Sequence, residues 1–408
     1  MTVIRIGICA LITFSVLAYG AVEPWSQAVL EIGAAALFLC WGSLVALGKA
    51  GTIRWNALLW PLIGLEALGL LQYLVPLSVY PNLTRLELLR FTSYLLLLFL
   101  LTQAFRTPRQ WGILAWYLIL FGFCVAVFGI LQDLTFNGKL YWFRELRNGG
   151  IPYGPYVNRN HFAGLMELVV PTGLAMLALP GVRRQQLPLV GLLATLPVGA
   201  LFLSASRGGI AALGCELIIL TILLWTRRKQ SGQLFTFIAA LVLAGGLVGW
   251  LGIGRVISRF SLVQSTEVTE SRRVSMARSA WHIFEDHPVI GTGMGTIVSV
   301  YPAYETVYDG KFVDHVHNDH AEMLAEMGSL GGICWLAFIG LLIYYGMKNL
   351  SAHQDPMVRA VQLGALVGCC GLLIHSFVDF NLHIPANALL FYLLAGLATS
   401  SPVFGPTN

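Results

Sequence analysis

Long apolar runs dominate the chain, and they restrict its fold more than any other feature of the sequence. Of the 408 residues, 57% are hydrophobic and only 11% are charged. A helix needs about 20 apolar residues to cross the ~30 Å hydrocarbon layer of a membrane, and runs of that length recur along the whole chain. The sequence therefore predicts an all-α polytopic membrane protein.

About twelve membrane-spanning helices are expected, in a single integral membrane domain over residues 1–408. The first run follows Arg5 and ends in small residues, as a signal peptide does, but the many later spans favour an uncleaved first helix. Two connections are long, residues 133–159 and residues 254–326, and the second lies between helices nine and ten. The expected spans are 4–22, 27–47, 56–75, 86–105, 111–132, 160–180, 187–204, 208–226, 234–253, 327–347, 358–378 and 386–403.

Basic residues occupy alternate short loops, and this pattern sets the expected orientation. They are Lys49, Arg54, Arg106, Arg109, Arg183, Arg184, Arg227, Arg228, Lys229, Lys348 and Arg359. Cytoplasmic loops are enriched in lysine and arginine, so we expect this side, with both termini, to face the cytoplasm. Both long connections then face outward.

Five polar motifs gather on the outward face under this topology. They are NRNHFAG (158–164), SASRGG (204–209), ESRRVSMARSAW (270–281), DHVHNDHAEMLAE (314–326) and DFNLH (379–383). Polar groups at a membrane edge are costly and tend to be functional. The outward face is therefore the expected place of the functional site.

Arginine is the chemically informative residue of two of these motifs. Arg207 lies at a tight turn between two apolar runs, where its guanidinium group can bind an anion through two parallel hydrogen bonds. Snorkelling to the interface is the alternative. Arg273 opens a predicted amphipathic helix on the outer membrane surface, beside Arg272. It can face a lipid phosphate there, or make ordinary headgroup contacts.

The motif DHVHNDHAEMLAE concentrates histidines and carboxylates in an otherwise apolar chain. His315, His317, Asp319 and His320 spell H-x-H-x-D-H, which is the zinc-binding pattern of metallo-β-lactamase-type hydrolases. That pattern belongs to a soluble fold, whereas here it leads directly into a membrane helix. A metal is therefore not expected, and a zinc hydrolase remains the alternative.

A catalytic histidine is the other interpretation of this motif. A neutral imidazole can accept a hydroxyl proton near pH 7, and we expect His317, beside Asn318, to do so. Glu322 follows Asp319 on one helix face. These carboxylates either orient the histidine or complement the dipole of the helix N-terminus.

The motif NRNHFAG places Asn158, Asn160 and His161 at the start of the sixth expected span. The asparagines either cap this helix or line a polar mouth that faces a sugar. Asp379, Asn381 and His383, which follow the eleventh span, are expected to join the same cavity.

The ordered set of these motifs resembles the O-antigen ligase/polymerase superfamily over residues 160–332 or so. The resemblance implies a membrane glycosyltransferase of C-type architecture, active without a metal or other cofactor in the bacterial inner membrane. The implied donor is an undecaprenyl-pyrophosphate-linked glycan on the periplasmic side. The implied acceptor is a hydroxyl of lipid A–core in ligases of lipopolysaccharide biosynthesis, or of another glycan in O-antigen and exopolysaccharide polymerases. By motif, Arg207 and Arg273 match the pyrophosphate-binding arginines, and His317 matches the essential histidine.

The chemistry of these residue types agrees with that assignment. Two outward arginines would stabilise the charge that grows on a departing pyrophosphate, and a single base beside them suits an inverting displacement. His315, His320, Glu322, Asn318, Arg272, Asn158, Asn160 and His161 are the expected substrate-binding residues. A ligase is expected ahead of a polymerase, and a small-anion transporter is the alternative from another class. The chain has no basic tail that would indicate a nucleic-acid partner.

Overall fold

The computed structural model describes residues 1–146, 151–225, 246, 270–308, 310 and 312–403. Within these residues the protein consists of helices and loops and contains no strand. The α-helices are α1 (Thr2–Leu17), α2 (Pro24–Ala46), α3 (Leu59–Leu74), α4 (Pro81–Ala104), α5 (Pro108–Leu134), α6 (Arg159–Ala178), α7 (Leu187–Leu203), α8 (Arg207–Trp225), α10 (Glu270–Asp286), α11 (Ile297–Val300), α12 (Asp319–Ala352), α13 (Pro356–His375) and α14 (Pro385–Thr399). Short 3-10 helices cover Tyr19–Ala21, Arg184–Gln186, Tyr301–Ala303 and Asn381–His383.

The described helices confirm an all-α polytopic membrane protein. Eight are long and apolar enough to cross a membrane, namely α2, α4, α5, α6, α7, α8, α12 and α13, and α1, α3 and α14 are shorter apolar helices. Each corresponds to one expected span. The expected span 234–253, the basic residues 227–229 and residues 254–269 of the second long connection lie outside the described residues.

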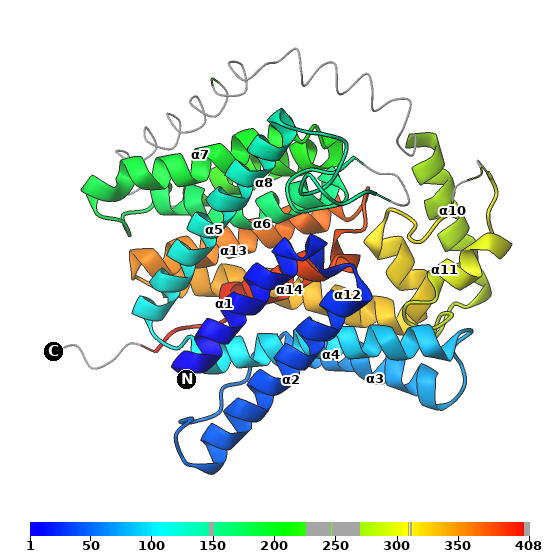
Figure 1. Ribbon diagram of the computed structural model, residues 1–408. Helices are drawn as coiled ribbons and strands as arrows, with labels where there is room; N and C mark the ends of the chain where they lie inside the picture. Colours follow the sequence, from blue (N-terminus) through cyan, green and yellow to red (C-terminus); the bar gives the residue numbers. More distant parts are fainter. Residues whose placement is uncertain (147–150, 226–245, 247–269, 309, 311, 404–408) are drawn as a thin grey trace.

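The centre of the bundle is the packing of α6 against α13, with α14 beside them (Figure 1). The apolar stretch of α6 is 100% buried inside the protein. Small residues allow the two helices to approach closely, because a Cβ added at Gly364 would lie 2.3 Å from the Cα of Thr172. The helices α7 and α8 cover one side of this centre, and α2, α3 and α4 lie on the other (Figure 1).

One face of the bundle brings together several of the predicted cytoplasmic loops. Arg106 donates to the Thr52 carbonyl at 2.7 Å, and Gln362 donates to the Ser400 carbonyl at 2.9 Å. The Asn349 amide also lies 3.3 Å from the Ser400 carbonyl oxygen. These loops therefore share one face, as the basic residues predicted, and the membrane side that this face adopts stays a prediction.

The opposite face carries the polar motifs, and α12 begins there with a polar part at Asp319. The φ of 60° and ψ of −163° at Gly328 bend the helix between this polar part and its apolar part. The apolar part begins at the bend, next to the predicted start of the span 327–347. A Cβ on Gly328 would lie 2.4 Å from the Val289 carbonyl carbon, so the chain around Val289 crosses directly over the bend.

Glu326 fastens that crossing segment to α12. Its two carboxylate oxygens accept hydrogen bonds from the backbone N–H groups of Gly295 and Ile297, each at 2.8 Å. The helix α10 packs beside this segment through Met276, Ala280 and Ile283, which are buried. The loop with Gly291, Gly293 and Gly295 thus folds the long connection back onto the membrane helices.

Candidate active site

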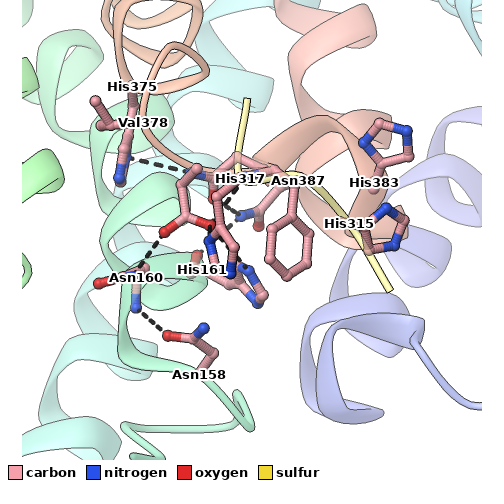
Figure 2. Close-up of polar contacts among 12 residues, drawn as sticks. Asn158, Asn160, His161, His315, His317, His375, Val378, His383 and Asn387 are labelled. Atoms are coloured by element: carbon pink, nitrogen blue, oxygen red, sulfur yellow. Dashed lines mark hydrogen bonds and ion pairs between the residues drawn. The ribbon is translucent and has the colours of Figure 1, made fainter. Parts of the chain in front are cut away.

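Asp379 is the centre of the polar cluster on this face. It is fully buried in the connection between α13 and α14. The Asn160 side chain donates to its Oδ2 at 2.6 Å. The His317 Nδ1 lies 3.4 Å from Oδ1, and the His161 Nε2 lies 3.7 Å from the same oxygen. Three predicted site residues, from α6 and from the segment before α12, therefore meet at one carboxylate, and Figure 2 shows Asn160, His161 and His317 close together.

The Asp379 carboxylate is held in its charged form. Burial favours the neutral acid, but the imidazoles of His161 and His317 keep the pKa of this carboxyl well below its usual range. The backbone N–H of Phe380 adds a hydrogen bond to Oδ1 at 2.9 Å. The Arg273 guanidinium lies 3.9 Å from Oδ2. The site therefore contains a fixed negative charge among several potential cations.

His317 has a backbone conformation that few side chains adopt. Its φ is 53°, in the left-handed region, which costs a non-glycine residue roughly 1–3 kcal/mol. Its ring contacts Phe380 edge-on, with 4.8 Å between centroids. Its Nδ1 lies on the Asp379 side of the ring, 3.4 Å from Oδ1. A proton on Nδ1 would leave the lone pair on Nε2, which is the tautomer that a general base requires.

Val378, the residue before Asp379, contacts Arg273 and lies close to Gly208, the residue after Arg207. Arg273 donates to the Val378 carbonyl at 2.7 Å. Arg207 is exposed and begins α8. The next residue, Gly208, packs so closely that an added Cβ would lie 2.6 Å from the His375 Nε2 and 3.1 Å from the Val378 side chain. The segments that carry the two arginines therefore contact one connection.

The turn SASRGG presents a helix N-terminus as well as Arg207. Ala205 has a φ of 55°, which reverses the chain between α7 and α8. The Ser206 hydroxyl accepts a hydrogen bond from the Gly209 N–H at 3.2 Å, as a helix cap does. The first turn of α8 therefore adds its partial positive charge to that of Arg207.

Two asparagines expected to bind substrate cap helices. The Asn158 side chain accepts from the Asn160 N–H at 2.9 Å and caps α6. The Asn318 side chain accepts from the N–H groups of His320 and Ala321, at 3.1 and 3.0 Å, and caps α12. Capping was the alternative left open for the asparagines of NRNHFAG, and it places His161 and His317 at helix starts.

Arg272 and His320 point to other partners. The Arg272 guanidinium contacts Glu305 at 3.1 Å and the Val307 carbonyl at 3.0 Å. The His320 Nε2 lies 3.0 Å from the Leu373 carbonyl oxygen, and its Nδ1 accepts from the Trp335 indole at 3.0 Å. Both nitrogens of His320 are thus occupied by protein groups, and these two residues join loops and helices rather than Asp379.

His315 and Glu322 form a second cluster with His383. The His315 Nδ1 lies 2.7 Å from the Glu322 Oε1, and the His383 Nε2 lies 3.3 Å from the same oxygen. His383 also contacts Asp319 at 2.8 Å through Nδ1. Figure 2 shows His315 and His383 beside each other and apart from His161 and His317.

Charge in this second cluster is set by its carboxylates. Burial of the His383 imidazole favours the neutral form, but Glu322 and Asp319 outweigh burial and raise its pKa to about 10. Burial likewise opposes charge on His315, yet Glu322 raises the pKa of His315 above its usual value. The cluster therefore attracts positive charge strongly.

The structure separates the three histidines of the H-x-H-x-D-H pattern. Each has its own partner: Glu322 for His315, Asp379 for His317 and the Leu373 carbonyl for His320. In the described part of the chain, the three side chains whose donor atoms come within 4.8 Å are His315, Glu322 and His383. The zinc hydrolase geometry implied by the pattern is therefore not the one found.

Sequence reasoning gave little weight to Asp379 and missed a buried pair beneath it. His375 Nδ1 lies 2.8 Å from Glu167 Oε1 inside the bundle, and both side chains are almost fully buried. The available signal was Glu167 itself, a carboxylate inside an apolar run, since such residues are rare in membrane helices unless paired or functional. For Asp379, the signal was its position directly after a span.

Part of the chain is similar to known proteins. Residues 192–336 match the O-antigen ligase family model. A teichuronic acid biosynthesis protein of Bacillus subtilis (strain 168) is 29% identical over 104 residues, which are 26% of this chain. The match spans 21%, about a fifth, of that relative's length. These similarities confirm the resemblance to the O-antigen ligase/polymerase superfamily.

Proposed function

Because residues 192–336 match the O-antigen ligase family model, we propose that the chain is a membrane glycosyltransferase of the O-antigen ligase/polymerase superfamily. Its donor is a glycan on undecaprenyl pyrophosphate, and its acceptor is a hydroxyl on the outer face of the bacterial inner membrane. Lipid A–core is the acceptor if the enzyme is a ligase. The observation that carries this proposal is the convergence of Arg273 and His317 on the buried Asp379.

The two arginines would bind the pyrophosphate. When the bond between the anomeric carbon and the phosphate oxygen breaks, the electron pair leaves with the pyrophosphate, whose negative charge grows. Arg207 and Arg273, with the N-terminus of α8, would stabilise that charge where membrane and protein exclude water. Removing one such donor costs on the order of 10²–10³ in rate. The arginines thus supply the positive charge that other glycosyltransferases take from a metal ion.

His317 would act as the general base. The acceptor oxygen attacks the anomeric carbon, and its proton passes to the His317 Nε2. The Asp379 carboxylate, 3.4 Å from Nδ1, would stabilise the resulting imidazolium. General-base catalysis contributes typically ~10²–10⁴ in rate. A single displacement of this kind inverts the anomeric configuration.

Polymerisation is the second candidate. The matched relative is named for the biosynthesis of teichuronic acid, a name that does not indicate ligation. A polymerase would use the same arginines and the same base, but its acceptor would be a second lipid-linked glycan. The proposed topology is common to both, with residues 133–159 and 254–326 outside and both termini in the cytoplasm.

Surface glycans and lipid-linked precursors of a deletion strain test the proposal. The strain is complemented with wild type, His317→Ala or Arg273→Ala, and Arg278→Ala serves as a control because Arg278 is exposed on the same helix. Long glycan retained on the lipid carrier would indicate a ligase, and single repeat units would indicate a polymerase. A normal profile with His317→Ala would refute the proposed base, and a normal profile in the deletion strain would refute the function.

A further inference from the structure

The cluster of His315, Glu322 and His383 has no part in the proposed transfer, and its donor atoms converge. One donor atom of each residue lies within 4.8 Å of the donor atoms of the other two, and Glu322 Oε1 lies next to both His315 Nδ1 and His383 Nε2. They come from the segment before α12, from its first turn and from the 3-10 helix Asn381–His383. We propose that these three side chains form a binding site for a divalent transition-metal ion, with Zn²⁺ as the expected ion.

The donor set and its spacing fit zinc. Two imidazoles and one carboxylate are ordinary zinc ligands, with bonds of ~2.0–2.2 Å that leave the donors of one tetrahedral ion roughly 3.3–3.6 Å apart. Here Glu322 Oε1 is 2.7 Å from the His315 nitrogen and 3.3 Å from the His383 nitrogen. Small side-chain shifts therefore bring all three atoms to coordination distance, and water completes the tetrahedron.

The surrounding groups orient the ligands. The Nδ1 of His383 is 2.8 Å from Asp319 Oδ1, which leaves Nε2 as the coordinating nitrogen, as in the carboxylate–histidine–zinc arrangement. The second oxygen of Glu322 accepts the Val316 N–H at 3.0 Å. Asp319 is held in turn by the Ser376 hydroxyl at 2.6 Å. Each of these contacts is made without the ion and directs a donor atom toward the same point.

The charge of the cluster also favours a divalent metal ion. Glu322 and Asp319 are buried and carry two negative charges between them when ionised. With both imidazoles neutral, a doubly charged ion neutralises the cluster. Protons on the imidazoles are the competing way to supply that charge, so binding weakens as the pH falls.

The ion would fasten His317 to the connection that carries Asp379. His315 lies two residues before His317, and His383 lies four residues after Asp379. Phe380 stacks on the His315 ring at 4.6 Å and touches His317 at 4.8 Å. The metal site therefore supports the strained backbone at His317 from the far side of Phe380. This inference does not depend on the proposed transferase activity.

Metal analysis of the purified full-length protein tests the inference directly. The protein is prepared with a tag that lacks histidine, stripped with a chelator, loaded with Zn²⁺ or Co²⁺ and dialysed. We expect one ion per chain, a cobalt absorption spectrum typical of nitrogen and oxygen ligands, and a higher unfolding temperature. His315→Phe keeps the ring that stacks on Phe380 but removes the donor, and we expect its affinity to fall by at least ~10²-fold.

Two further variants make the result decisive. Asp319→Asn, which alters only the orienting group, should weaken binding by ~10–100-fold. His282→Ala removes an exposed histidine whose Nδ1 lies 2.9 Å from Glu285, away from the proposed ligands, and this variant should bind zinc as wild type does. Equal zinc in wild type and His315→Phe would overturn the proposal, whether both bind the ion elsewhere or neither binds it.

Discussion

Replacing the buried carboxylate of Asp379 by an amide tests how the proposed base works. Asp379→Asn keeps the size of the side chain and can keep a hydrogen bond with Asn160, but it removes the negative charge beside His317. We expect the transfer rate to fall while the affinity for the donor changes little. The reason is that the imidazolium of His317 forms only as the acceptor proton is transferred.

The distance between the two side chains gives the magnitude. Two unit charges 3.4 Å apart interact with about 5 kcal/mol at an effective dielectric constant of ~20. Arg273, 3.9 Å from the same carboxylate, already offsets part of its field. We therefore expect about half of that interaction, ~2–3 kcal/mol, which corresponds to a rate ~10²-fold lower.

The assay is transfer of a labelled glycan from the lipid pyrophosphate by purified protein in nanodiscs, with kcat and KM measured separately. Asp286→Asn is the matched control, because Asp286 is exposed on α10 and accepts from Tyr304. A wild-type kcat for Asp379→Asn would refute the role of the carboxylate. A large rise in KM at unchanged kcat would show that Asp379 positions Arg273 for donor binding instead.

Three further substitutions or conditions have defined outcomes. Gly291→Ala adds a side chain to a residue with φ of 70° and places Cβ 2.2 Å from the Glu326 carbonyl. The unfolding temperature should drop, because backbone strain alone costs ~1–3 kcal/mol. Gly48→Ala is the control for strain without a clash, since Gly48 has φ of 69° and open space around it. Arg273→Lys keeps the charge but loses the planar guanidinium group that can donate two parallel hydrogen bonds, so the KM for the donor should rise about tenfold. An unchanged KM would contradict bidentate phosphate binding. The pKa of Asp379 is depressed in the folded protein. The ionised carboxylate therefore stabilises the folded state above an unfolded pKa of ~3.9, and this effect is lost as the pH falls through the folded value. The difference in unfolding temperature between wild type and Asp379→Asn should shrink as the pH falls below about 4, and a difference that does not shrink would contradict the depressed pKa.

The membrane fold was largely predictable because it depends on local composition. An apolar run of about 20 residues has few alternatives to a membrane helix, and the matches between expected and described helices follow from that. The bend at Gly328, between the polar and apolar parts of α12, was not predicted. Hydropathy identifies only the apolar part, whereas the backbone angles at Gly328 depend on the segment around Val289 that crosses it.

Most residues of the candidate site could be predicted from the sequence, but which of them contact one another could not. Polar residues at the ends of spans identified Asn160, His161, Arg273 and His317, and the structure brings these to Asp379. Which carboxylate serves which histidine depends on contacts between positions far apart in the chain. The spacing of neighbouring histidines suggested that they act together, but each turns to a partner from a different element.

The separation of these partners identifies which part of the site is rigid. Asp379 lies in the short connection between α13 and α14, and Asn387 ties the start of α14 to the His161 carbonyl of α6 at 2.8 Å. Both α6 and α14 are buried throughout, so the carboxylate and Asn160 have fixed positions. Arg273 and His317 reach it from the long connection outside the bundle. If the proposed transferase admits two bulky lipid-linked substrates, we expect the opening beside its reacting atoms between this connection and the bundle rather than inside the packed helices. The fixed carboxylate then gives the arginine and the base a common reference point whenever the connection lies against the bundle.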